Sequence, residues 1–233
     1  DKLVQEKAFG LFANAYLAVA SKGADSFKAV FAKYNRTRKE DFQIRTAILE
    51  ENGKRYVEKT ALTAAAEAHI RSMREKYEKL TSVNPAVKVL EPHYSKDNKA
   101  VRFGFLKGKT LAEILGEQIT GKKAPVEALK AAMDRVFGQA VLKKEPFTPT
   151  DQFKEVFGDS EEILSLQDTS YEVSNIDGLF ENLMETQDGL YCLDYEWVFD
   201  FPIPAGFIRY RNLVYFYYKY EGLLDYENAV QFL

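Results

Sequence analysis

Residues 171–201 read YEVSNIDGLFENLMETQDGLYCLDYEWVFDF. Within them, Asp188-Gly189 stands between two apolar runs, Leu183-Met184 and 190–193. Asp-Gly is a frequent two-residue turn of a β-hairpin, because a type I′ turn requires positive φ at both central residues. The stretch therefore predicts a hairpin that reverses the chain at Asp188-Gly189.

This turn is predicted to bring two possible metal ligands together. With Asp188 and Gly189 at its centre, Asn182 opposes Tyr195 and Asp194 opposes Leu183, so Asn182 and Asp194 lie side by side. An amide oxygen beside a carboxylate suits a hard cation such as Mg²⁺, which keeps waters and phosphate oxygens in its other positions. We therefore expect Asn182 and Asp194 to bind Mg²⁺.

Asp177 lies five residues before Asn182, which gives the spacing D-x-x-x-x-N. In the catalytic loop of protein kinases, the Asp of this pattern orients or deprotonates the acceptor hydroxyl and the Asn holds Mg²⁺. Asp194 then falls where the second metal-binding Asp belongs. A purely structural reading stays open, because Asp and Asn are favoured at turns and strand ends in any case.

With these residues the chain resembles the protein-kinase-like superfamily. Leu193-Asp194-Tyr195-Glu196 is similar to the I-D-F/W-E segment of its small-molecule branch, the aminoglycoside phosphotransferases and choline kinases. The longer string DYEWVFDFPIP resembles kinase-like modules of bacterial surface-glycan proteins, which stand beside glycosyltransferase or methyltransferase domains. Two features depart from the family: Asn175 replaces the usual His in Asn175-Ile176-Asp177, and the sequence has no Asp-Phe-Gly.

Composition excludes several classes of function. The 233 residues are 46% hydrophobic and 14% aromatic, which is enough for a real core. A net charge of −3 with mixed signs disfavours a nucleic-acid partner. The single cysteine, Cys192, excludes an internal disulfide and fits a reducing, cytoplasmic location. We expect no transmembrane segment, since no run of 18 apolar residues occurs. We also expect the chain to be an excerpt of a longer protein, since it begins at Asp1.

The N-terminal half predicts one helix and three strands. Residues 3–21 have the apolar spacing of an amphipathic helix, and residues 27–34 are predicted to form a strand before a polar turn. Residues 42–48 alternate, Asn52-Gly53 predicts a second hairpin, and residues 55–59 form the returning strand.

Lys59 shares a strand face with Val57, the face that we expect to be buried. This is unusual, because lysine is rarely buried without a partner. The resemblance assigns Tyr56-Val57-Glu58-Lys59 to the family's V-A-I-K segment, so that Lys59 contacts the α- and β-phosphates of ATP. A surface lysine whose stem lies along the strand is equally compatible with the sequence.

Residues 62–80 carry a helical apolar stripe with Thr63 as the predicted N-cap. In the family this helix offers a glutamate that fixes the lysine, and the candidates are Glu67 and Glu75. Glu67 is nearer in sequence and is our choice for a cofactor-binding role with Lys59, although the helix dipole alone also favours a Glu in the first turn.

Further elements complete the predicted order. Residues 87–89 and 101–105 are predicted to pair as strands, which gives a sheet of about five strands. Residues 106–111 resemble the hinge of small-molecule kinases, with Thr110 opening a helix. Residues 125–142 predict a helix that supports the catalytic loop, and the aromatic segment 206–224 is expected to pack in the core of the second lobe rather than line a membrane or a partner.

No glycine-rich phosphate loop is present, because residues 34–39 read YNRTRK. Arg36, Arg38 and Lys39 either meet phosphate by charge or are simply solvated.

The sequence thus predicts an α+β, two-lobed protein-kinase-like fold, with a small antiparallel sheet lobe (1–106) and a mainly helical lobe (107–233). The resemblance implies a phosphotransferase that moves the γ-phosphate of ATP, with Mg²⁺, to a hydroxyl of a small molecule or surface glycan. In it Asp177 is the catalytic base, Asn182 and Asp194 bind metal, and Lys59 and Glu67 bind nucleotide. The alternative is a non-catalytic kinase-like module that docks partner domains of a glycan-assembly protein, and nucleotide binding distinguishes the two.

Overall fold

The structure is a computed structural model that describes residues 27–138 and 142–225. The predicted helix at residues 3–21 lies outside the described residues. The chain forms two compact units: the described part of the first comprises residues 27–72 and 92–105, and that of the second comprises residues 73–91 and 106–225 with the gap already given.

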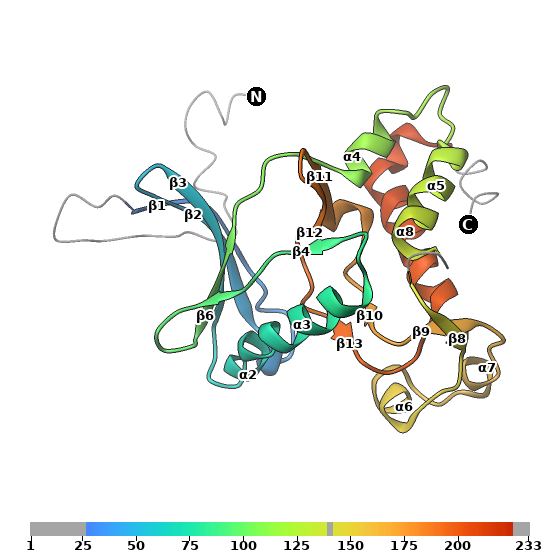
Figure 1. Ribbon diagram of the computed structural model, residues 1–233, viewed down its shortest axis with the longest axis horizontal. Coiled ribbons are helices and arrows are strands. Elements are labelled where there is room, and N and C mark those ends of the chain that lie inside the picture. The colour runs from blue at the N-terminus through green and yellow to red at the C-terminus, as the bar shows by residue number, and fades with distance from the viewer. Residues whose placement is uncertain (1–26, 139–141, 226–233) are drawn as a thin grey trace. The chain divides into compact units, whose positions relative to one another are not determined.

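The first unit is built on an antiparallel sheet of five strands in the order β1-β2-β3-β6-β5 (Figure 1). Its strands are β1 (Phe27–Tyr34), β2 (Ile44–Glu51), β3 (Lys54–Ala61), β5 (His93–Tyr94) and β6 (Ala100–Gly104). The short 3₁₀ helix η2 (Glu40–Phe42) and the helix α2 (Glu67–Arg71) belong to the same unit. The predicted α+β class with an antiparallel sheet is confirmed.

The β2–β3 hairpin turns where the sequence predicts. Asn52 has φ of 52° and Gly53 has φ of 74°, the two positive values that a type I′ turn requires. In the resulting register Lys59 pairs with Thr46 on one side and Val101 on the other. Lys59 is only 4% exposed, so the alternative of a surface lysine is wrong.

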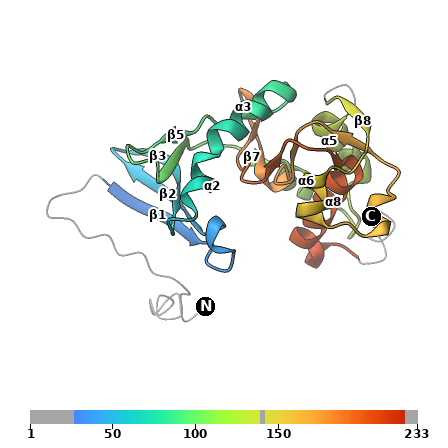
Figure 2. The ribbon, with the colours of Figure 1, turned by 90° about the horizontal axis from the view of Figure 1, so that it is seen from below.

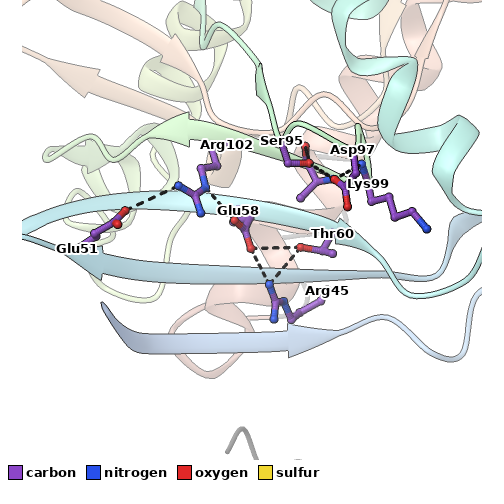
Figure 3. Close-up of polar contacts among 9 residues, drawn as sticks. Arg45, Glu51, Glu58, Thr60, Ser95, Asp97, Lys99 and Arg102 are labelled. Atoms are coloured by element: carbon purple, nitrogen blue, oxygen red, sulfur yellow. Dashed lines mark hydrogen bonds and ion pairs between the residues drawn. The ribbon is translucent and has the colours of Figure 1, made fainter. Parts of the chain in front are cut away.

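The opposite face of β3 carries a buried carboxylate between two guanidinium groups (Figure 3). Glu58 is 8% exposed. It accepts hydrogen bonds from Nη2 of Arg45 on β2 at 2.6 Å and from Nε of Arg102 on β6 at 2.9 Å. Because a buried charge is tolerated only when it is paired, this cluster connects the three central strands through their side chains.

The predicted pairing of residues 87–89 with residues 101–105 is wrong. The strand β4 (Lys88–Val89) instead pairs in parallel with β12 (Gly189–Cys192) of the second unit, and β5 takes the place next to β6. Alternation shows that a segment is extended, but it does not show which strand becomes its neighbour.

The predicted helix at residues 62–80 is divided into α2 and α3 (Met73–Val83), with Ser72 between them. The hydroxyl of Ser72 donates to the carbonyl of His69 at 2.7 Å, a local bond that competes with helix continuation. Thr63 does not sit directly before α2, but its Oγ1 accepts from the backbone N–H of Ala66 at 3.1 Å and so orders the preceding turn.

The second unit has most of the helices and three small sheets. Its remaining elements are β7 (Lys109–Thr110), α4 (Leu111–Gly116), α5 (Val126–Phe137), β8 (Lys144–Pro146), α6 (Asp151–Phe157), α7 (Glu161–Leu164), β9 (Thr169–Tyr171), β10 (Ser174–Asn175), η3 (Phe180–Asn182), β11 (Leu183–Thr186), β13 (Val198–Phe199), β14 (Ile203–Pro204), α8 (Ala205–Tyr220) and η4 (Glu221–Leu223). The strand orders are β4-β12-β11-β7, β14-β9-β8 and β10-β13. Helices α5 and α8 lie together in both views (Figures 1 and 2), and an ion pair of 2.7 Å joins Asp134 of α5 to Arg209 of α8.

Three predictions for this unit have different outcomes. Thr110 caps α4 in a complete capping box with Glu113, as expected. Helix α5 begins after Pro125 but ends at Phe137 rather than at 142, because the backbone of Gly138 turns to an extended conformation. Helix α8 buries a stripe that includes Ile208 and Phe216, whereas several of its tyrosines are exposed, so core packing describes only one of its faces.

Tyr171 links β9 to α5 and gives a test of the fold. Its hydroxyl donates to the carbonyl of Phe137 at 2.8 Å, and burial raises the pKa of Tyr171 to about 12. An unfolded tyrosine ionises near a pKa of about 10. The contribution of Tyr171 to the free energy of unfolding is therefore fully present below pH 10. It falls as pH rises toward 12, since in that range the unfolded state loses the tyrosine proton and the folded state keeps it.

We expect Tyr171→Phe to have a lower melting temperature at pH 8, because the Phe137 carbonyl loses its donor, but a shallower decline above pH 10 than the wild type. Melting curves between pH 8 and pH 11.5 measure both effects. Parallel curves for the two proteins above pH 10 would contradict the raised pKa.

Candidate functional site

The β11–β12 hairpin forms, but its register differs from the prediction. Leu183 pairs with Cys192 and Thr186 pairs with Gly189, so Gln187 and Asp188 are the central residues. Positive φ occurs at Gly189, with a value of 120°, and not at Asp188. The hydroxyl of Thr186 accepts from the backbone N–H of Asp188 at 3.1 Å, and this bond favours the observed turn.

The predicted oppositions of Asn182 with Tyr195 and of Asp194 with Leu183 are therefore wrong. The carbonyl of Asn182 instead accepts from the backbone N–H of Leu193 at 2.8 Å. Asn182 is thus the last residue of the 3₁₀ helix η3 and lies opposite Leu193, the residue before Asp194. The two candidate metal ligands, Asn182 and Asp194, therefore remain at the same end of the hairpin.

The D-x-x-x-x-N segment is closed by its own side chain. Nδ2 of Asn182 donates to the backbone carbonyl of Asp177 at 2.9 Å. This bond determines which end of the amide is nitrogen, because only the NH₂ group can donate to a carbonyl. The oxygen Oδ1 of Asn182 is therefore turned away from Asp177 and is the atom that offers lone pairs to a cation.

Asn175 joins this segment to the one that carries Asp194. Its Oδ1 accepts from the backbone N–H of Asp177 at 3.0 Å, and its Nδ2 donates to the backbone carbonyl of Asp194 at 3.1 Å. Sequence reasoning treated Asn175 only as a departure from the family pattern. In the structure it connects the main chain at Asp177 with the main chain at Asp194.

A third asparagine supports the same loop from α8. Asn212 is 1% exposed. Its Oδ1 accepts from the N–H of Phe180 at 2.8 Å, and its Nδ2 donates to the carbonyls of Gly178 and Ile208, at 3.2 Å each. Sequence reasoning missed Asn212, although one sign was present: it lies four residues after Ile208 and four before Phe216, on the apolar stripe of its helix.

The residues after Asp194 hold its backbone in place. The Tyr195 hydroxyl donates to the carbonyl of Leu90 at 2.7 Å, and the Glu196 carbonyl accepts from Nζ of Lys76. Oδ1 of Asp194 itself accepts from the N–H of Glu196 at 3.2 Å. The segments that carry Asp177, Asn182 and Asp194 are thus joined in the second unit by hydrogen bonds.

Lys59 and Glu67 belong to the first unit. Glu67 makes ion pairs with Lys99 at 3.0 Å and with Arg71 at 3.3 Å, and the hydrogen bond from Lys99 is the main reason that the pKa of Glu67 lies below its usual value. The expected role of Glu67 in positioning Lys59 stays a prediction.

The turn that lacks glycines is ordered by a side chain. Nε2 of Gln43 donates to the carbonyls of Arg36 at 3.2 Å and Arg38 at 3.0 Å, within the connection between β1 and β2. Whether the basic side chains of this turn meet phosphate stays a prediction.

Two features are absent from the described residues, a cluster of metal-binding side chains and a membrane-spanning helix. Within residues 27–138 and 142–225, no group of three or more His, Cys, Asp or Glu side chains is placed to hold a metal ion. Over the same ranges, no helix has both the length and the apolarity that crossing a membrane requires.

The chain is similar in structure to several phosphotransferases. MphH, a macrolide 2′-phosphotransferase from Brachybacterium faecium, is 11% identical, with 89% of this chain and 78% of that one covered and a TM-score of 0.40. Choline kinase LicA from Streptococcus pneumoniae is 12% identical, with coverage of 100% and 78% and a TM-score of 0.40. The aminoglycoside phosphotransferase APH(4)-Ia, solved with ADP and hygromycin B, is 10% identical, with coverage of 84% and 80% and a TM-score of 0.41. No protein-family model and no curated protein sequence matches the chain.

Removal of the Asn175 amide tests the connection between the two segments. We expect Asn175→Ala to lower the free energy of unfolding by about 2 kcal/mol, because a backbone N–H and a backbone carbonyl both lose their partner. Hydrogen exchange at the Asp177 amide should also become faster. Asn84→Ala is a matched control, since the Asn84 side chain also makes two backbone bonds, with Ala86 and Val136. It should lower stability and leave exchange at Asp177 unchanged, so equal exchange in both variants would contradict the role of Asn175.

Proposed function

We propose that this protein is a kinase-like phosphotransferase that moves the γ-phosphate of ATP to a hydroxyl group of a small molecule or surface glycan. The observation that carries the proposal is a set of hydrogen bonds that joins Asp177 directly to Asn182 and, through Asn175, to Asp194. One carboxylate for the acceptor and two oxygen ligands for a metal are the parts that phosphoryl transfer needs from this region.

Asp177 is the proposed catalytic base. Its backbone carbonyl is held by Asn182 and its backbone N–H by Asn175, so the main chain at this position is fixed on both sides. In the proposal, the carboxylate carried by this fixed main chain orients an acceptor hydroxyl for attack and accepts its proton.

Asn182 and Asp194 are the proposed magnesium ligands, and their donor atoms fit the ion. Nδ2 of Asn182 is bonded to the carbonyl of Asp177, which leaves Oδ1 as the donor, and Asp194 supplies a carboxylate. Few protein oxygens are typical for Mg²⁺, which completes its octahedral coordination with waters and phosphate oxygens. When bound, the ion neutralises charge on the transferring phosphate.

Lys59 and Glu67 are the proposed nucleotide-binding residues of the first unit. Lys59 is buried on β3, where lysine is unusual, and this position supports the proposal. In the proposed nucleotide-bound protein, Lys59 contacts the α- and β-phosphates. Glu67 then gives up its ion pairs with Lys99 and Arg71 and pairs with Lys59 instead.

Binding of ATP is expected to require a divalent ion, since the proposed site in the second unit offers a carboxylate and an amide rather than positive charge. A thermal-shift series with millimolar ATP, with and without Mg²⁺, measures this. A ligand at about one hundred times its dissociation constant adds about 2.7 kcal/mol to stability, enough for a clear rise in melting temperature. If ATP with Mg²⁺ stabilised no more than Mg²⁺ alone, the non-catalytic docking module would replace the phosphotransferase.

Two isosteric variants separate the roles of the carboxylates. We expect Asp177→Asn to reduce phosphate transfer by about 10²- to 10⁴-fold and to keep Mg-ATP affinity, because only the proton acceptor is lost. Asp194→Asn should reduce both, because the cation loses the carboxylate of this region. Titration of labelled nucleotide at fixed Mg²⁺, together with a transfer or slow ATP hydrolysis assay, distinguishes them.

Asp188→Asn is the matched control, since Asp188 is an exposed turn residue of the same hairpin. It should behave as the wild type in both assays. Unchanged nucleotide affinity in Asp194→Asn would remove the metal site from the proposal.

A further inference from the structure

The side chain of Arg211 on α8 lies against the backbone of the candidate loop. Its Nε donates to the carbonyl of Ile176 at 3.3 Å. This carbonyl belongs to the peptide group that joins Ile176 to Asp177. With standard peptide dimensions, Nε of Arg211 therefore lies within about 6 Å of the Cα of Asp177. Helix α8 thus places a positive charge beside the proposed catalytic base.

Two aromatic rings flank the guanidinium group of Arg211. Phe207 and Tyr215 lie four residues before it and four residues after it, on the same face of α8. Cζ of Arg211 is 5.8 Å from the ring centroid of Phe207 and 5.1 Å from that of Tyr215. The rings are 37% and 42% exposed, so they hold the guanidinium at the surface of the unit rather than in its core.

Arg211 differs from the other arginines of the described helices and strands, because those seven all pair with a carboxylate. They are Arg45, Arg55, Arg71, Arg74, Arg102, Arg135 and Arg209. Arg211 makes no ion pair within residues 27–138 and 142–225, and its printed contacts are one backbone carbonyl and two rings. Its charge is therefore not balanced by a carboxylate of the described chain.

The two Nη groups of Arg211 are open to a ligand. Neither makes a hydrogen bond with a described residue, and neither is among the buried polar atoms that lack a partner in that part of the chain. Both groups therefore reach solvent. The N–H donors at this end of a guanidinium match the two oxygens of a carboxylate or a phosphate.

We propose that Arg211 binds an anionic group of the phosphoryl acceptor, so that the acceptor is a hydroxyl compound that carries a carboxylate or a phosphate. The inference rests on the proposed function, because it names the acceptor class for the same loop. An anionic acceptor is repelled by Asp177, by Asp194 and by the phosphates of ATP, and the charge of Arg211 offsets part of this repulsion. Since Arg211 and Asp177 are so close, one small molecule can place its anionic group on the guanidinium and a hydroxyl at Asp177.

The test compares D-glucuronate and glucose 6-phosphate with neutral D-glucose, by amide chemical shifts of the whole ¹⁵N-labelled chain without nucleotide. We expect saturable shifts at residues 176–178 and 207–215 with both anionic sugars. Glucose should bind about tenfold more weakly or less, because it forms no charge-assisted hydrogen bond. Inorganic phosphate should bind more weakly than glucose 6-phosphate, because it leaves the exposed rings of Phe207 and Tyr215 without contact.

Arg211→Met keeps an apolar stem between the two rings and removes the charge. We expect it to weaken binding of both anionic sugars about ten- to hundredfold and to leave glucose unchanged. Arg211→Lys keeps the charge without the paired donors, so its affinity should fall between those of the wild type and Arg211→Met.

Arg209→Met is the matched control. It removes the same charge from the same helix, but the Arg209 guanidinium already pairs with Asp134. It should bind the anionic sugars as the wild type does. Equal weakening in Arg209→Met and Arg211→Met would overturn the proposal, since net charge alone would then explain the effect.

A kinetic measurement separates binding from positioning of the loop. With Mg-ATP and glucose 6-phosphate, Arg211→Met should raise KM for the sugar and leave kcat nearly unchanged. A fall in kcat with unchanged affinity for the anionic sugars would mean that Arg211 only positions the loop through Ile176, and would overturn the proposal.

Three further outcomes of the binding experiment would contradict it. These are equal affinity for glucose and the anionic sugars, equal affinity for inorganic phosphate and glucose 6-phosphate, which would show an adventitious ion only, and unchanged binding in Arg211→Met. Anionic sugars that bind through Arg211 but receive no phosphate would refute the proposed function and leave the anion site in place. The two failures are therefore distinguishable.

Discussion

Irregular backbone inside a folded unit must have its N–H and carbonyl groups satisfied, and this requirement governs the loop from Asn175 to Asn182. No regular helix or long strand is available there to do so. Three asparagine side chains take over: Asn175 and Asn182 from within the loop and Asn212 from α8. An amide has both a donor and an acceptor, so one side chain can bond to two backbone groups of opposite kind. The positions of Asp177 and Asp194 depend on this arrangement.

The two hairpins show how far local sequence determines local structure. Asn52-Gly53 forms the predicted turn, because both residues readily adopt positive φ. Asp188-Gly189 has nearly the same turn chemistry, yet the hydroxyl of Thr186 bonds across the turn and shifts the register. A two-residue pattern predicts that a hairpin exists, but a single side-chain hydrogen bond outside that pattern can change its register.

Contacts between residues that lie far apart in the chain are harder to predict from the sequence. The spacing of Asp177 and Asn182 identified the candidate loop, because five residues of separation are visible in the sequence itself. The partners of Asn175 lie two and nineteen residues away, and Asn212 reaches the loop from a helix thirty or more residues later. Likewise, alternation at residues 87–89 predicted an extended segment, but the parallel pairing of β4 with β12 depends on the path of the whole unit. Such contacts are set by tertiary packing, which one sequence without its relatives does not show.

The bonds of Asn175 have an evolutionary consequence. Both of its partners at positions 177 and 194 are backbone atoms, an N–H and a carbonyl, which every residue except proline provides. The two bonds of Asn175 therefore do not depend on which side chains occupy these positions, although the Asp194 carboxylate also accepts from the N–H of Glu196. A descendant of this chain that exchanges either aspartate keeps both bonds of Asn175, so the main chain at positions 177 and 194 outlasts a change of the side chain that it carries.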